Sequence, residues 1–150
     1  MAGLYVFIFL VSMQIIFTVN AAPYFDGLPP EAEKMLKECN ESFPIDMGYL
    51  KDLNDTGSFH DEDNKTPKCF IRCVLMKAGL MDEDFTFDAP KLKEAFKDSK
   101  YPDMDNMIDM CIAKDTETQC RCTKAYLFIK CLMSEEITKY GDASKVKTSN

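Results

Sequence analysis

Cysteines are the residues in this chain whose type and spacing most clearly point to chemistry. The sequence contains seven of them. Six follow a hydrophobic leader, and an even set in an exported chain is typical of a framework of three disulfides. The spacing alone leaves fifteen different pairings open. These six cysteines, spaced C-x29-C-x3-C-x37-C-x10-C-x8-C, are Cys39, Cys69, Cys73, Cys111, Cys122 and Cys131.

The leader favours export of the protein. Residues 1–25 have no charged side chain and include a nearly unbroken apolar run from Leu4 to Phe17. This run is shorter than the roughly 20 residues that span a bilayer, and no basic cluster follows it, so a membrane anchor is the less favoured alternative. We therefore predict a signal peptide over residues 1–21, a single domain with a polar C-terminal tail over residues 22–150, and a secreted, extracellular protein.

The charge of the chain excludes several classes of partner. Acidic residues number 25 and basic residues 18, which gives a formal net charge of −7. Such a protein repels phosphate backbones and anionic lipid head groups, so we expect no nucleic-acid partner and no electrostatic membrane docking. The sequence has neither zinc-ligand spacing nor a glycine-rich phosphate loop, so we also expect no metal and no cofactor.

Apolar residues recur with the period of an α-helix, and no segment shows the sustained alternation of a strand. We therefore expect an all-α fold, a compact bundle of about six helices. Thr66 is the expected N-cap of the third helix, Asp88 caps the fourth, and the polar tail after Glu136 is expected to be exposed and partly disordered. The predicted helices cover residues 29–39, 45–53, 66–79, 88–96, 104–112 and 125–133.

The helices also place the cysteines relative to one another. Cys69 and Cys73 are four residues apart, so their sulfur atoms lie on one face of the third helix, a turn apart. One helix can therefore be bonded to two different neighbours. Cys39 and Cys111 fall on the apolar stripes of the first and fifth helices, which places them toward the core.

This cysteine pattern resembles that of insect odorant-binding proteins, the six-cysteine carriers of pheromones and general odorants. The two short spacings, between Cys69 and Cys73 and between Cys122 and Cys131, match the family, and the resemblance extends from Cys39 to Cys131. It implies that the three bridges interlock around a hydrophobic cavity. The implied pairs are Cys39–Cys73, Cys69–Cys122 and Cys111–Cys131.

Cys120 departs from the family pattern because it is a seventh cysteine, two residues before Cys122. Side chains two residues apart on a helix point in different directions, so Cys120 does not easily replace Cys122. We expect a free thiol at this position. The alternative is an intermolecular disulfide that produces a homodimer.

The resemblance also implies a ligand pocket among the third to sixth helices. Methionine adapts to irregular guests, although composition alone makes these residues ordinary core. Tyr126 has two alternative roles, a hydrogen bond to a ligand hydroxyl or carbonyl, or a bond to the protein backbone. Matched by their offsets from the cysteines, the implied ligand-binding residues are Val74, Leu92, Phe96, Met104, Met107, Tyr126, Ile129 and Leu132.

The predicted function is that of a carrier for small hydrophobic molecules, odorants or pheromones, through aqueous fluid to a membrane odorant receptor. Two alternatives remain, a carrier of the same fold in a gland, venom or reproductive fluid, and a secreted helical signalling protein without a cavity. We do not expect an enzyme. The single histidine, His60, lies in an acidic segment without a nucleophile motif, and the His–Asp pair of secreted phospholipases is missing.

Overall fold

The computed structural model of the chain describes residues 27–114, 118 and 120–145. Six α-helices occur in these ranges and no strand, apart from an isolated bridge between Met81 and Phe87. The predicted all-α bundle is therefore confirmed, whereas the predicted signal peptide over 1–21 lies outside the described residues. The helices are α2 (Pro30–Ser42), α3 (Met47–Thr56), α4 (Lys65–Lys77), α5 (Ala89–Ala95), α6 (Met104–Ala113) and α7 (Arg121–Lys145).

Short side chains at the helix N-termini fix where several helices begin. The carboxylate of Asp88 accepts a hydrogen bond from the backbone N–H of Lys91 at 3.0 Å and caps α5, as predicted. The prediction that Thr66 caps α4 is wrong. Asn64 occupies that position, because its side-chain oxygen accepts from the backbone N–H of Thr66 at 3.1 Å, so the helix starts earlier than expected.

The connector from Leu80 to Asp88 leaves α4 at a tight turn. Gly79 follows the helix with φ +71°, a left-handed conformation that glycine adopts without steric cost. Phe85 is the non-glycine residue of the described ranges that has a positive φ, at 65°. The connector therefore holds a large aromatic side chain in a backbone conformation that such residues rarely adopt.

The last helix is much longer than predicted. The expectation of partial disorder after Glu136 is wrong for residues 137–145, which continue α7, whereas Thr138 and Lys139 are exposed as expected. The ammonium of Lys139 lies 2.8 Å from a carboxylate oxygen of Asp103, and the Tyr140 hydroxyl donates to the same carboxylate. The ring of Tyr140 also stacks on Tyr101, with centroids 4.5 Å apart. These contacts hold the polar end of the helix against the segment before α6.

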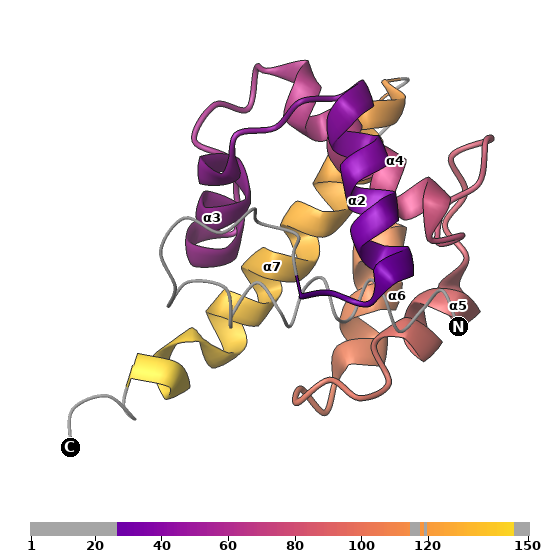
Figure 1. The fold of residues 1–150 in the computed structure, drawn as a ribbon. Coiled ribbons are helices and arrows are strands. Elements are labelled where there is room, and N and C mark those ends of the chain that lie inside the picture. The colour runs from indigo at the N-terminus through magenta and orange to yellow at the C-terminus, as the bar shows by residue number, and fades with distance from the viewer. Residues whose placement is uncertain (1–26, 115–117, 119, 146–150) are drawn as a thin grey trace.

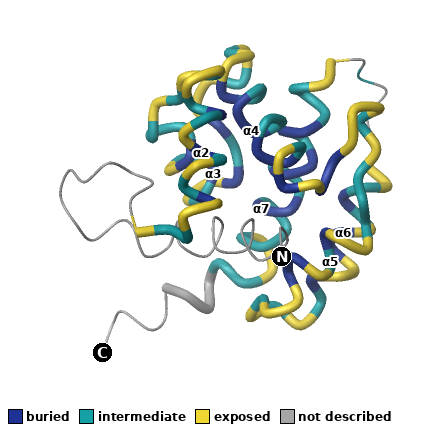
Figure 2. Tube along the Cα trace, turned by 45° about the vertical axis from the view of Figure 1, so that its right-hand side comes forward, coloured by how far each residue is buried: buried dark blue, intermediate teal, exposed yellow. Residues whose placement is uncertain are grey.

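The long helix α7 lies at the centre of the bundle (Figure 1). Helix α4 packs along it, α2 packs against α4, and α3 and α6 also contact α7. Buried positions lie on the inward sides of the helices, and exposed positions lie on the outside (Figure 2). Among the described helices, none combines the length and the hydropathy needed to cross a bilayer.

Candidate ligand-binding site

Three disulfides connect the helices that surround the interior. Cys39–Cys73 joins α2 to α4, Cys69–Cys122 joins α4 to the start of α7, and Cys111–Cys131 joins α6 to α7. These are the pairs that the resemblance implies. Because α4 contributes two cysteines from consecutive turns, it is covalently tied to two neighbours, and the bundle cannot open along α4 without breaking a bond.

Cys120 is exposed and forms no disulfide in the structure. Hydrogen bonds with the side chain and the backbone of Thr123 lower the pKa of its thiol. The thiolate form is therefore favoured relative to an ordinary cysteine.

The interior enclosed by the disulfides is apolar throughout the described residues, with no polar or charged residue among the buried ones. The eight residues predicted to bind ligand all lie in this single hydrophobic cluster, and each has at most 7 % of its surface exposed. Their contact with a ligand stays a prediction, and we call these eight the lining residues for that predicted role. By element they are Val74 in α4, Leu92 in α5 and Phe96 at its end, Met104 and Met107 in α6, and Tyr126, Ile129 and Leu132 in α7.

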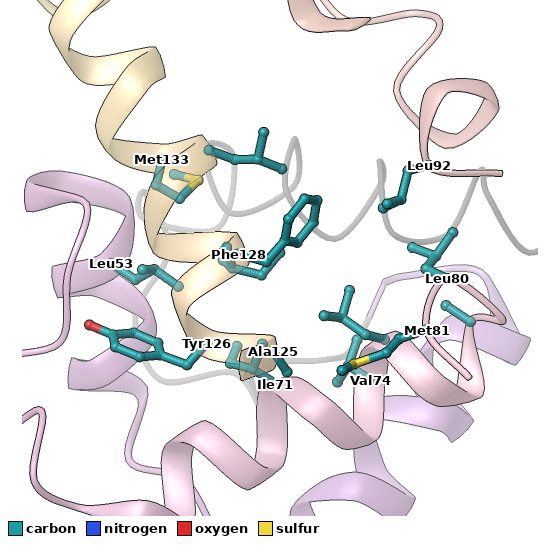
Figure 3. Close-up of a cluster of buried hydrophobic side chains, with 14 of the residues drawn as sticks. Leu53, Ile71, Val74, Leu80, Met81, Leu92, Ala125, Tyr126, Phe128 and Met133 are labelled. Atoms are coloured by element: carbon teal, nitrogen blue, oxygen red, sulfur yellow. The ribbon is translucent and has the colours of Figure 1, made fainter. Parts of the chain in front are cut away.

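Other side chains join the lining residues in the same cluster (Figure 3). Phe128 and Met133 come from the middle of α7, where the sequence is apolar nearly all round. Leu80 and Met81 come from the connector, which has no helical period to reveal its inward side. The apolar character of α7 was therefore a usable signal for Phe128, whereas the connector residues offered none.

A small recess opens next to the Cys111–Cys131 disulfide. Its volume is about 30 Å³, which accommodates roughly two water-sized groups. The rings of Phe87 and Phe128, with centroids 4.4 Å apart, form part of its wall. None of the eight lining residues borders this recess. Its wall consists of Phe87, Cys111, Ile112, Lys114, Lys124, Leu127 and Phe128.

Tyr126 is almost fully buried, and its hydroxyl is bonded to the protein. The hydroxyl donates to a carboxylate oxygen of Glu62 at 2.5 Å and accepts from the backbone N–H of Phe59 at 3.0 Å. Burial first, and then the bond to Glu62, raise the pKa of the tyrosine. The bond from the Phe59 N–H is the backbone bond of the second predicted role, and Glu62 engages the hydroxyl proton in addition. Tyr126 offers its ring to the interior and ties the segment before α4 to α7.

Glu62 is the charged end of this connection. Its carboxylate also forms an ion pair with Lys130, one turn further along α7 than Tyr126. The bond to Lys130 and then the bond from the Tyr126 hydroxyl lower the pKa of Glu62. Its folded-state pKa therefore lies below its unfolded value. The connection contributes stability above the unfolded pKa of about 4.3, and this stability is lost as the pH falls through the lower folded pKa.

Replacing Tyr126 by phenylalanine is expected to lower the free energy of unfolding at pH 7 by about 1–2 kcal/mol, because Glu62 and the Phe59 N–H each lose a partner. The loss should be smaller at pH 3, where Glu62 is protonated in more of the molecules. Urea unfolding at the two pH values measures both effects. Glu62→Gln is the matched control, because it keeps an acceptor for Tyr126 and removes the titration. A Tyr126→Phe variant as stable as the parent at pH 7 would contradict this assignment.

Comparison with known proteins agrees with the family resemblance of the cysteine pattern. Residues 22–135 match the profile of the PBP/GOBP family. The chain is 24 % identical over 107 residues to general odorant-binding protein 84a of Drosophila melanogaster, an alignment that covers 71 % of this chain and 58 % of that protein. The aligned part thus spans less than two thirds of that relative. No solved structure shows a significant match to the chain.

Proposed function

The chain belongs to the PBP/GOBP family, and we propose that it is a secreted carrier that binds small hydrophobic molecules of the odorant or pheromone type. The observation that best supports this proposal is an enclosed interior whose buried side chains are all apolar in the described residues. Three disulfides hold the surrounding helices together. A shell of this kind provides an apolar environment for a molecule that dissolves poorly in water.

We place the ligand among the lining residues. Met104 and Met107 face this interior from α6, and their unbranched, polarisable side chains adapt to guests of irregular shape. Leu92 and Phe96 come from α5 and its C-terminal end, which packs against α6, and α7 contributes Ile129 and Leu132. The absence of buried charge in the described interior favours a ligand that is mostly hydrocarbon.

The energetics of such a ligand suit transport and release. Burying about ten methylene groups yields roughly 8 kcal/mol at about 0.8 kcal/mol for each. Association costs about 4 kcal/mol or more, which removes a large part of this gain. Contacts with aromatic rings add to the remainder. The remaining gain of about 4 kcal/mol corresponds by itself to a millimolar dissociation constant, so a micromolar affinity requires about 4 kcal/mol more from these ring contacts. We expect an affinity on the order of micromolar, which is tight enough to solubilise a volatile compound and loose enough to release it.

Delivery to a membrane odorant receptor is the role we propose within a chemosensory organ, and the same binding chemistry would serve a carrier in a gland or reproductive fluid. Tissue localisation of the transcript, in antenna or in gland, separates these two roles. A helical signalling protein would instead act through its surface and would not need the interior.

The proposal predicts stoichiometric binding of a fluorescent apolar probe such as N-phenyl-1-naphthylamine. We expect a saturable rise in fluorescence with a dissociation constant on the order of micromolar and one site per chain. Medium-chain alcohols, aldehydes and esters should displace the probe. The same titration with reduced and unfolded protein is the control for nonspecific adsorption. Absence of saturable binding to the oxidised protein would rule out the carrier function and favour the signalling alternative.

A further inference from the structure

The two arginines of the chain, Arg72 and Arg121, lie over the same aromatic ring. Arg72 belongs to α4, Arg121 is the first residue of α7, and the ring is that of Phe85 in the connector. The guanidinium carbon of Arg121 lies 4.2 Å from the ring centroid, and that of Arg72 lies 5.9 Å from it. A guanidinium on an aromatic face keeps its N–H edges available for hydrogen bonds.

Neither guanidinium has an anionic partner within the described residues. Lysines form all the ion pairs found there apart from one that involves His60, and no carboxylate pairs with Arg72 or Arg121. The Nε atom of Arg72 is buried and has no hydrogen-bond partner. The chain has a net charge of −7, yet these two neighbouring cations have no carboxylate partner in the part of the chain that the structure describes. An external anion would supply the missing charge and an acceptor.

The helix that follows Arg121 adds to the positive charge. The free backbone N–H groups at a helix N-terminus carry a partial positive charge, which acidic residues usually balance in the first turn. The first turn of α7 contains no acidic residue and begins with Arg121 itself. The positive end of α7 and the two guanidinium groups therefore reinforce one another.

Two aromatic residues of the connector lie in sequence between the arginines and the recess. Phe85 contacts Arg121 at the start of α7, and two residues later in the connector Phe87 contacts Phe128. Arg121, Lys124 and Phe128 lie on one side of α7, since they are spaced i, i+3 and i+7. Lys124, Phe87 and Phe128 all border the recess of about 30 Å³. The recess thus begins about one helical turn from Arg121.

We propose that Arg72 and Arg121 bind the carboxylate head group of an amphiphilic ligand, whose hydrocarbon chain runs along Phe87 to the recess beside Phe128. The planar fork of a guanidinium matches the two oxygens of a carboxylate, and Phe85 holds both forks in place. This inference rests on the proposed carrier function and adds medium-chain carboxylic acids as a ligand class, whose hydrocarbon chain starts outside the lining residues, at the recess. Phe128 also belongs to the interior cluster.

Because the chain has two arginines, its ¹⁵N spectrum contains two arginine Nε–Hε signals, which Arg72→Lys and Arg121→Lys assign. Titration of the oxidised protein with sodium octanoate at constant ionic strength should shift both signals saturably. Octanol should leave them in place, and sodium acetate should shift them only at much higher concentration. Inorganic phosphate separates a carboxylate site from a general anion site. Equal shifts with phosphate and octanoate, or none with octanoate, would overturn the proposal.

Affinities of variants test the same assignment independently. Arg72→Gln and Arg121→Gln should each weaken octanoate binding about tenfold, the effect of one lost charge-assisted hydrogen bond, without changing the affinity for octanol. Lys34→Gln is the matched control, because Lys34 is an exposed cation on α2 whose carboxylate contact is long, at 3.8 Å. Equal losses of affinity for octanoate and for octanol would overturn the proposal.

The outcomes also separate this inference from the carrier function on which it rests. Binding of octanol without any preference for octanoate would overturn this inference alone. Failure of both ligands and of the apolar probe to bind would overturn the carrier function.

Discussion

Replacing Cys69 and Cys122 together by alanine is expected to lower the free energy of unfolding by about 4 kcal/mol. This disulfide joins residues separated by 53 positions, the longest of the three separations. A longer closed loop restricts the unfolded chain more strongly, so its loss costs more stability. The bond also connects the two helices that pack along each other at the centre of the bundle. Urea unfolding of the oxidised protein at pH 7 measures the difference.

Cys120→Ala is the matched control for this experiment, because Cys120 is exposed, unpaired and two residues from Cys122. It should change the free energy of unfolding by less than about 0.5 kcal/mol. The Cys111–Cys131 disulfide closes a shorter loop, with a separation of 20. Replacing both of its cysteines by alanine should therefore lower the free energy of unfolding by about 3 kcal/mol. A loss for Cys120→Ala as large as that for the double variant would show that Cys120, rather than Cys122, pairs with Cys69.

The helical framework could be predicted from the sequence because its signals are local. The carboxylate of Asp88 bonds to a backbone group only three residues away, so its position before an apolar run was sufficient to identify the start of α5. The start of α4 was ambiguous, since Asn64 and Thr66 are both good N-caps and lie two residues apart. The apolar period also indicated which side chains of α6 point inward, whereas those of α7 were implied by the family resemblance, and the lining residues of both helices are buried.

The features that sequence reasoning missed depend on contacts between distant residues. The end of α7 is held by the bond from Tyr140 to Asp103, 37 residues earlier, and a polar segment does not reveal such a partner. Tyr126 and Glu62 are 64 residues apart, and Glu62 lies in the acidic segment between two predicted helices, where no local pattern indicates a partner. The positions of Arg72, Phe85 and Arg121 likewise depend on how the connector passes α4 and α7, because three separate elements meet there.

The interior itself is best probed by a pair of leucines that are equally buried. Leu92 in α5 and Leu36 in α2 are both 0 % exposed, and only Leu92 is among the lining residues. Leu92→Ala and Leu36→Ala should each lower the free energy of unfolding by about 3 kcal/mol, because each leaves a cavity in a packed core. The two variants therefore match in the size of the defect and differ in whether the ligand reaches it.

The response of these variants to decanol distinguishes a ligand pocket from an ordinary core. In Leu92→Ala the ligand extends into the new space, and each methylene group it places there contributes about 0.8 kcal/mol, so decanol should bind several-fold more tightly than to the parent. Binding stabilises the folded state by mass action, so saturating decanol should recover more stability in Leu92→Ala than it adds to the parent. Leu36→Ala should bind decanol as the parent does and recover nothing beyond that. Equal recovery in the two variants would mean that the ligand does not lie against α5, and the lining residues would then have to be sought elsewhere in the bundle.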